Sequence, residues 1–266
     1  MPLPPVFDNF YWADEPWGLS LRCLPLDRVA SHLFSTRNLG LRVGLRSPGW
    51  SALATSFGVN ASSIVRISQV HGCAVVSVLA EEQSPAMATT PEADAIVSND
   101  SARVVTVQSA DCVPVLLADP VTGMVAAVHA GWRGTAARAV RAAVDAMRRL
   151  GARPADLVAA IGPSIGPCCY EVGEELVDAF AAARHPATDL ERWFIRSVAG
   201  KPRLDLPSAN RDQLVAAGLR PDRVHACGLC TASNLDVLYS FRAEGPSTGR
   251  LVAAIRCRPQ LPSARA

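Results

Sequence analysis

The feature that most constrains this chain is a pair of short apolar runs joined by a turn. Val113–Ala118 and Met124–Val128 are apolar throughout, and the segment 119–123 between them reads Asp-Pro-Val-Thr-Gly. Short apolar runs around a Pro/Gly turn predict a buried β-hairpin. Cys112 precedes the first run and His129 follows the second. The sequence therefore places a thiol and an imidazole at the same, open end of the hairpin.

The register of this hairpin decides whether those two side chains meet. If the loop is Asp119–Thr122, with Ala118 opposite Gly123, then Cys112 lies opposite His129. Directly opposite residues have Cβ atoms about 4.5–5.5 Å apart, whereas a slip of one residue would send them to opposite faces. A thiolate and an imidazole this close are typical of one edge of a zinc site or of a nucleophile–base pair.

The remaining pattern predicts the fold class. Helices and strands are interspersed without strict alternation, which favours an α+β (layered α/β) fold with mixed sheets in a single compact domain, 1–266. Within it, 1–29 is expected to be a poorly defined N-terminal segment and 257–266 a C-terminal tail. Further expectations are helices over Thr135–Leu150, Glu174–Ala183 and Asp205–Gly218, strands over Ile64–Gln69 and Val237–Phe241, and irregular chain over 185–203.

Composition narrows the function classes. With 26 basic and 24 acidic residues the net charge is +2, which argues against a nucleic-acid or anionic-membrane partner. No apolar run reaches the roughly 18 residues of a membrane span, and the first residues do not resemble a signal peptide. The eight cysteines do not form a dense framework, so we expect them to be reduced and the protein to be cytoplasmic.

A third candidate ligand, His71, follows the strand expected before Gln69-Val70. A catalytic zinc needs three protein ligands and one open position for water or substrate. His71, Cys112 and His129 would be the three ligands. The alternative is that His71 is a hydrogen-bonded structural histidine. Asp111, next to Cys112, is either a carboxylate that accepts a hydrogen bond from a ligating imidazole or a solvent-facing residue at the strand entry.

A possible anion site follows the hairpin, where Gly131–Thr135 runs directly into a helix. Helix N-terminal N–H groups and the guanidinium of Arg133 together suit an anion, and Arg37 and Arg242 at other strand ends would complete an arginine pocket. The alternative is a tight turn with solvated arginines. Glu171, in the loop before a helix, is either a general acid or base or a residue that favours the positive helix end.

Two other cysteine patterns are not expected to bind metal. The neighbours Cys168 and Cys169 point apart in an extended backbone. Cys227 and Cys230 form a CxxC pattern, but no second pair or suitably spaced histidine accompanies it, and it lacks the strand-to-helix context of a redox motif.

Taken in order, a series of short motifs resembles the YfiH-like family from about residue 30 to 256. Members of this family were once labelled polyphenol oxidases with a laccase domain and are described as purine nucleoside phosphorylases. The similarity is carried by Ser35-Thr36-Arg37, Gln69-Val70-His71-Gly72, Ala110-Asp111-Cys112-Val113-Pro114, His129-Ala130-Gly131-Trp132-Arg133-Gly134, Ile161-Gly162-Pro163, Tyr170-Glu171-Val172-Gly173, Leu204-Asp205-Leu206 with Asn210, Cys230-Thr231 and Thr248-Gly249-Arg250. The chain departs after Arg37, where Asn38–Arg42 replaces the usual His-Gly-Gly-Val-Ser.

The resemblance implies stacked mixed sheets flanked by helices and a zinc ion held by residues matching His71, Cys112 and His129. It also implies phosphorolysis of adenosine, inosine and 5′-methylthioadenosine, deamination of adenosine and, in some bacterial members, hydrolytic editing of peptidoglycan precursors. Zinc-activated water would account for deamination and arginines for phosphate binding.

Three other functions compete with this hypothesis. A metal-free hydrolase would use Cys112 as nucleophile and His129 as base. A binding module would hold a structural zinc with a fourth ligand, for which the sequence offers no convincing candidate. A copper oxidase fits poorly, since its copper centres need more histidines than the five present.

Overall fold

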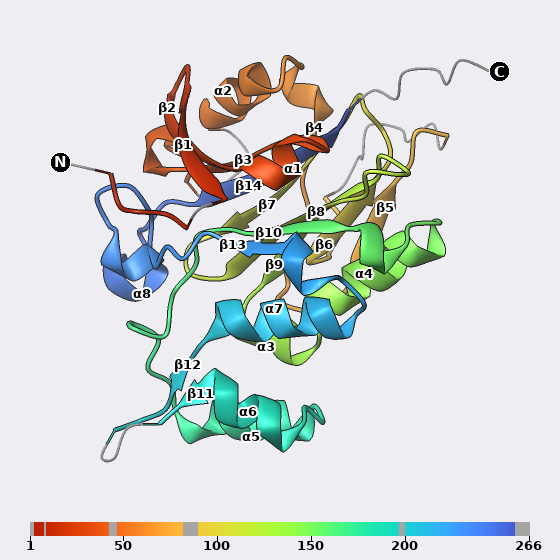
Figure 1. The fold of residues 1–266 in the computed structure, drawn as a ribbon. Coiled ribbons are helices and arrows are strands. Elements are labelled where there is room, and N and C mark those ends of the chain that lie inside the picture. The colour runs from red at the N-terminus through yellow and green to blue at the C-terminus, as the bar shows by residue number, and fades with distance from the viewer. Residues whose placement is uncertain (1–2, 8, 43–46, 82–89, 197–199, 259–266) are drawn as a thin grey trace.

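The computed structural model describes residues 3–7, 9–42, 47–81, 90–196 and 200–258, and two six-stranded mixed sheets lie stacked at its centre (Figure 1). The first sheet has the order β1 (Phe10–Glu15), β2 (Gly18–Cys23), β3 (Ala30–Ser35), β14 (Leu251–Cys257), β7 (Val104–Ser109) and β4 (Ile64–Val65). The second has the order β13 (Val224–Ala226), β10 (Val158–Ile161), β8 (Val113–Ala118), β9 (Val125–Ala130), β6 (Ala95–Ser98) and β5 (Val75–Val78).

Helices cover the outer face of each sheet. On the second sheet lie α3 (Trp132–Ala136), α4 (Ala139–Arg149) and α7 (Leu206–Ala216), with α5 (Glu174–Ala182) and α6 (Ala187–Trp193) below them in Figure 1. On the first sheet lies α2 (Gly49–Ser56). The other α-helices and strands of the described ranges are the short helices α1 (Leu24–Asp27) and α8 (Phe241–Glu244) and the small sheet of β11 (Phe194–Ile195) and β12 (Arg203–Leu204). None of the helices in the described ranges is long and apolar enough to cross a membrane.

The hairpin β8–β9 forms the middle of the second sheet, and every residue of its two strands is buried. Leu116 and Ala127 pack between the two sheets, whereas Leu117 and Val128 pack against the helices. Because successive side chains of a strand point to opposite faces, a strand covered on both faces has to be apolar throughout. This accounts for the two uninterrupted apolar runs and confirms the predicted layered fold with mixed sheets and flanking helices.

Both ends of the chain contain more structure than expected. The prediction of a poorly defined segment over 1–29 is wrong, because β1 and β2 pair antiparallel at the edge of the first sheet, from Phe10 opposite Cys23 to Glu15 opposite Gly18. Phe10 and Cys23 are buried in the layer between the sheets. At the other end β14 continues through Cys257, so that residue belongs to the core and not to a tail; residues 259–266 lie outside the described ranges.

The helix expected over Thr135–Leu150 is two helices, because Arg138 between α3 and α4 has a left-handed φ of 62°. The guanidinium of Arg138 donates to the carbonyls of Ala183 and Arg184 at 2.9 and 3.0 Å, which holds the break in place. The chain over 185–203, expected to be irregular, contains α6 and the strands β11 and β12.

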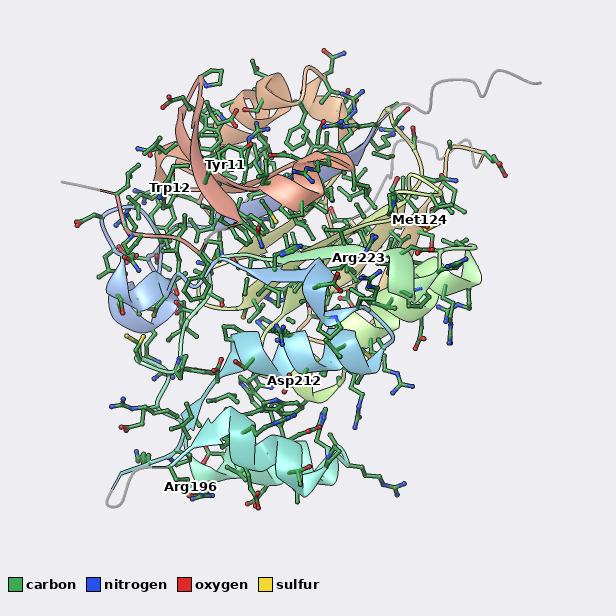
Figure 2. All side chains as sticks on the ribbon, viewed as in Figure 1. Tyr11, Trp12, Met124, Arg196, Asp212 and Arg223 are labelled. Carbon is green, nitrogen blue, oxygen red and sulfur yellow. The ribbon has the colours of Figure 1, made fainter. Side chains whose placement is uncertain are left out.

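Two strand predictions also need correction. The strand expected over Ile64–Gln69 ends at Val65, and the one expected over Val237–Phe241 is a turn that leads into α8. In α6, the indole of Trp193 is buried and donates to Asp212 of α7 at 2.9 Å, which ties the two helices together. Figure 2 labels Asp212 on α7. A buried aromatic with a polar partner explains why a helix forms where the sequence shows no clear amphipathic pattern.

Candidate functional site

The hairpin register differs from the predicted one by two residues. Pro114 pairs with His129, and the backbone N–H of Asp119 donates to the carbonyl of Met124 at 2.8 Å, so the four-residue loop begins one residue later than expected. The reason is the Asp119 carboxylate, which accepts from Thr122 Oγ1 at 2.7 Å and organises the turn. A shift of two residues preserves the face of the sheet. Cys112 and His129 therefore still lie on one side, as diagonal neighbours.

Three side chains converge at the open end of this hairpin. The ligand atoms of His71, Cys112 and His129, which we call the cavity triad, lie within 4.8 Å of one another. The two imidazole rings are 4.9 Å apart between centroids and inclined at 78°, so they do not stack. His129 is the last residue but one of β9, Cys112 immediately precedes β8, and His71 lies in a turn with a φ of 61°. These are the residues that the sequence placed together.

A carboxylate that the sequence analysis missed, Asp94, holds two members of the triad. It is fully buried before β6. One of its oxygens lies 2.9 Å from Nδ1 of His129, and the carboxylate accepts backbone N–H bonds from His71 at 3.0 Å and Gly72 at 2.6 Å. His129 therefore has its other ring nitrogen, Nε2, available toward Cys112 and His71. The signal was a lone aspartate within the apolar stretch Ala93–Val97, which requires a buried partner.

The triad is also coupled electrostatically. Burial opposes ionisation of Cys112, but its hydrogen bonds to His129 and His71 prevail and lower the pKa of the thiol to about 6. Burial also disfavours a charged His129, but Asp94 and Cys112 raise the pKa of that imidazole to about 9. Without a metal, the pair is a thiolate beside an imidazolium at neutral pH.

The triad has room on one side. Gly131 follows β9, and a Cβ at that position would lie 2.8 Å from Cys112 Sγ and 3.1 Å from Cδ2 of His71. The triad also lines one part of a cavity of about 620 Å³. Two imidazoles and a thiolate with an open side are the donor set of a catalytic zinc site, so these residues fit that metal.

Arginines line the same cavity. Arg133, at the start of α3, lies over the ring of Trp132 at 4.2 Å, and Arg242 of α8 lies over Tyr170 at 5.0 Å. Arg250, just before β14, is the third. The other lining residues are Ile67, Gln69, Gln108, Ser109, Ala110, Asp111, Ile165, Leu206 and Phe241.

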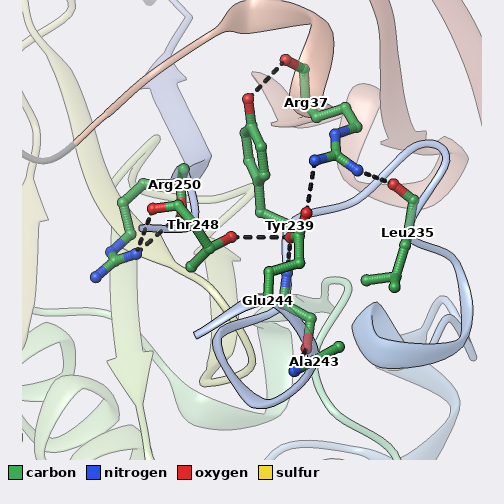
Figure 3. Close-up of polar contacts among 9 residues, drawn as sticks. Arg37, Leu235, Tyr239, Ala243, Glu244, Thr248 and Arg250 are labelled. Atoms are coloured by element: carbon green, nitrogen blue, oxygen red, sulfur yellow. Dashed lines mark hydrogen bonds and ion pairs between the residues drawn. The ribbon is translucent and has the colours of Figure 1, made fainter. Parts of the chain in front are cut away.

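Arg37 is not among the lining residues, and Arg250 takes its place. The Arg37 guanidinium donates to Glu244 at 2.7 Å and to the carbonyl of Leu235, and it lies 4.6 Å from the ring of Tyr239 (Figure 3). With a carboxylate partner and an aromatic neighbour, the Arg37 guanidinium stabilises the segment around α8.

The loop after Arg37, where the chain departs from the YfiH-like pattern, is well packed. Leu39 and Leu41 are buried beside α2, and Gly40 has a left-handed φ of 66°. The carbonyl of Leu41 accepts from the backbone N–H of Arg250 at 2.8 Å. This loop therefore holds the backbone of a cavity arginine.

Asp111 and Glu171 have structural partners. The sequence left two roles open for Asp111, a bond to a ligating imidazole or a solvent-facing place at the strand entry, and its partners in the structure differ from both. Its carboxylate accepts from Thr231 Oγ1 and from the backbone N–H of Arg242, both at 2.6 Å, and its own φ is 89°. Glu171 is exposed and is not among the lining residues; its backbone carbonyl accepts from Arg242 Nη1 at 2.9 Å. Both residues thus hold Arg242.

All eight cysteines lie within the described ranges and are free thiols, as expected. The prediction that Cys168 and Cys169 point apart is wrong, because the backbone there is a turn, with the N–H of Cys169 donating to Gly166 at 3.0 Å. Their sulfurs and that of Cys230 lie within 4.8 Å of one another. Cys227 is not part of this group, so the CxxC pattern itself is not a ligand pair.

Comparisons with known proteins identify the family of this chain. Residues 29–258 match the family described as multi-copper polyphenol oxidoreductase laccase. The chain is 37% identical over 210 residues to adenosine deaminase RL5 from an unknown prokaryotic organism, covering 76% of this chain and 78% of the relative. It is 38% identical over 203 residues to a purine nucleoside phosphorylase of Deinococcus radiodurans, covering 76% and 74%.

Among solved structures, YfiH of Bacillus licheniformis, described as a hypothetical protein, superposes with a TM-score of 0.83 at 28% identity, covering 95% of this chain and all of the other. YlmD of Geobacillus stearothermophilus superposes with a TM-score of 0.81 at 29% identity, covering 93% and 98%.

Proposed function

Because the chain belongs to the family described as multi-copper polyphenol oxidoreductase laccase, and its relatives include purine nucleoside phosphorylases, we propose that it is a purine nucleoside-processing enzyme. Its reactions are phosphorolysis of adenosine, inosine and 5′-methylthioadenosine to the base and a ribose 1-phosphate, and deamination of adenosine to inosine. One observation carries the proposal: the cavity triad and three arginines line a single cavity.

The metal in this proposal is Zn²⁺, held by His71, Cys112 and His129. A zinc ion bound there lowers the pKa of water to about 7 and so supplies a nucleophile for deamination. Asp94 keeps His129 in the required tautomer by accepting from its Nδ1–H. It also fixes the turn that presents His71 through the backbone N–H bonds.

Phosphorolysis uses the other part of the cavity. Arg133, Arg242 and Arg250 bind phosphate, because a guanidinium holds two oxyanion oxygens through parallel N–H bonds. A phosphate oxygen attacks the sugar carbon, and the base leaves with the electrons of the broken C–N bond and takes up a proton. Phe241 is 48% exposed beside these arginines and offers an aromatic face to a purine ring. Asp111 is a positioning residue in this scheme, since it holds the Arg242 backbone.

Incubation with adenosine, with and without phosphate, tests the proposal once the products are separated. We expect adenine and ribose 1-phosphate only when phosphate is present, and inosine in both cases. Arg133→Ala should lower phosphorolysis about tenfold or more and leave deamination much less affected. Arg148→Ala, on the exposed side of α4, is the matched control. If Arg133→Ala abolished deamination and spared phosphorolysis, these assignments would be wrong.

A second candidate function is a metal-free amide hydrolase, such as one that edits peptidoglycan precursors. The thiolate–imidazolium character of Cys112 and His129 favours it, since the same pair activates a nucleophilic cysteine. Zinc analysis separates the two functions. Stoichiometric zinc that is lost in His71→Ala supports the nucleoside enzyme, whereas full activity after chelator treatment supports the hydrolase.

A further inference from the structure

A second group of ligand atoms lies outside the cavity triad. Cys168, Cys169 and Cys230, which we call the sulfur cluster, have their sulfurs within 4.8 Å of one another. Two segments far apart in sequence bring them together. Ser164 and Cys230 form a parallel bridge, and the N–H of Thr231 donates to the carbonyl of Ser164 at 3.0 Å.

The surroundings of these sulfurs are polar and leave space. The backbone N–H of Gly166 donates to Cys230 Sγ at 3.3 Å, and the hydroxyl of Ser233 lies 3.2 Å from Cys169 Sγ and 3.6 Å from Cys168 Sγ. Gly166 has no side chain to fill the space between the thiols, since a Cβ there would lie 3.4 Å from both Cys168 Sγ and Cys230 Cβ.

One thiol of the cluster is buried in the fold and another is accessible to solvent. Cys230 is 8% exposed, whereas Cys168 is exposed. Cys168 and Cys230 also line a cavity of about 600 Å³ that is separate from the one containing the triad. Three thiols close enough to share one ion, one of them buried and one exposed, form a candidate ligand set.

We propose that the sulfur cluster is a binding site for a thiophilic metal ion, Cu(I) or Zn(II), distinct from the proposed zinc site of the cavity. Soft thiolate ligands select these ions over Mg²⁺, Ca²⁺ or Mn²⁺. An ion about 2.3 Å from each sulfur places the sulfurs about 4 Å apart, which is compatible with sulfurs that lie within 4.8 Å of one another. Each ligating thiol releases its proton to solvent as its metal–sulfur bond forms.

The ion would join two segments that border the catalytic cavity. The turn with Cys168 and Cys169 lies between Ile165 and Tyr170, which both line that cavity. Thr231, next to Cys230, donates to Asp111. Because an ion that binds the folded state stabilises it by mass action, occupancy of the cluster should raise the melting temperature.

Metal titration of the full chain, reduced and stripped of metal, tests this site. Cu(I) is titrated against a chromogenic Cu(I) chelator and, in a separate arm, Zn(II) against a zinc chelator. Wild type should bind one ion more than Cys168→Ser/Cys169→Ser in at least one arm, and the arm that shows the difference identifies the ion. Cys73→Ser, which removes an exposed thiol outside both groups, is the matched control and should bind as wild type does.

Cys112→Ser separates this proposal from the proposed function. That variant should lose the ion of the cavity triad but keep the ion of the sulfur cluster, and the ion should still raise its melting temperature. Cys230→Ala provides a second variant if the double variant does not fold. Equal binding by wild type and the folded cluster variants would overturn the proposal, and so would a disulfide between two cluster thiols in freshly purified, metal-free protein.

Discussion

The cavity triad and the sulfur cluster differ in what holds their side chains in place. The triad is supported by the buried carboxylate of Asp94. This carboxylate contacts the imidazole of His129 and accepts from the backbone N–H of His71. The cluster is supported by the Ser233 hydroxyl, which lies near two of its thiols, and by the Gly166 N–H, which donates to the third. The difference predicts that the triad is held in place before any ligand binds, as the proposed catalytic role requires, whereas the cluster would adjust its side chains to the proposed ion.

The largest expected effect comes from removing the charge behind the triad. Asp94→Asn puts an amide where a buried carboxylate accepts backbone N–H groups, so it should lower the free energy of unfolding by about 3–5 kcal/mol. Metal affinity of the triad should fall about 10–100-fold. Urea unfolding and zinc analysis measure these quantities. Asp145→Asn, on the surface of α4, should cost less than about 1 kcal/mol, and equal losses in both variants would show that Asp94 has no special role.

A smaller effect should follow from filling the space beside the triad. Gly131→Ala places a methyl group 2.8 Å from Cys112 Sγ, which must displace the thiol. We expect a loss of about 1–3 kcal/mol in unfolding free energy and weaker zinc binding. Gly72→Ala adds the same methyl group where the nearest atoms are 3.6 Å away, and should retain zinc. Zinc retention by Gly131→Ala would mean that the metal lies elsewhere.

The pH dependence of alkylation compares individual thiols from the two groups in metal-free protein. Because the pKa of Cys112 is lowered to about 6, its reactive thiolate is present above that pH and is lost below it. The pKa of Cys168 is raised to about 11, so this thiol stays protonated at pH 7 although it is more exposed. Peptide mass spectrometry after brief iodoacetamide treatment at pH 7 should show Cys112 modified at least about tenfold faster. The reverse order would contradict the electrostatic coupling of the triad.

The smallest effect is expected at the support of the sulfur cluster. Ser233→Ala removes a hydroxyl that contacts two thiols at the surface, and should change the free energy of unfolding by only about 0.5–1 kcal/mol. Ion affinity of the cluster should decrease several-fold without loss of the site. A loss as large as that of Asp94→Asn, measured by the same urea titration, would remove the distinction between the two groups.

The sequence alone predicted the features of the fold and of the site that depend on local patterns of apolar and polar residues. The apolar runs predicted the hairpin β8–β9, and the convergence of His71, Cys112 and His129 followed from strand ends together with the family resemblance. The register was wrong by two residues because Asp119 builds a turn with its side chain, yet the face was right because side chains alternate with a period of two.

Long-range partners explain the remaining differences. The role of Asp94 depends on its contact with the imidazole of His129, which lies 35 residues away in the sequence. The helix is interrupted at Arg138 because its guanidinium donates to backbone carbonyls near residue 184. Arg37 does not line the cavity because its guanidinium pairs with Glu244. In each case a polar partner far along the sequence outweighs the local pattern, and one sequence without its fold does not identify that partner.

The most direct test of the account compares wild type and His71→Ala in the adenosine reaction, with zinc content measured on the same samples. If the cavity triad holds a catalytic zinc, wild type forms inosine and contains zinc, and His71→Ala loses both while its melting curve stays cooperative. A folded His71→Ala protein that deaminates adenosine at the wild-type rate would contradict the central claim.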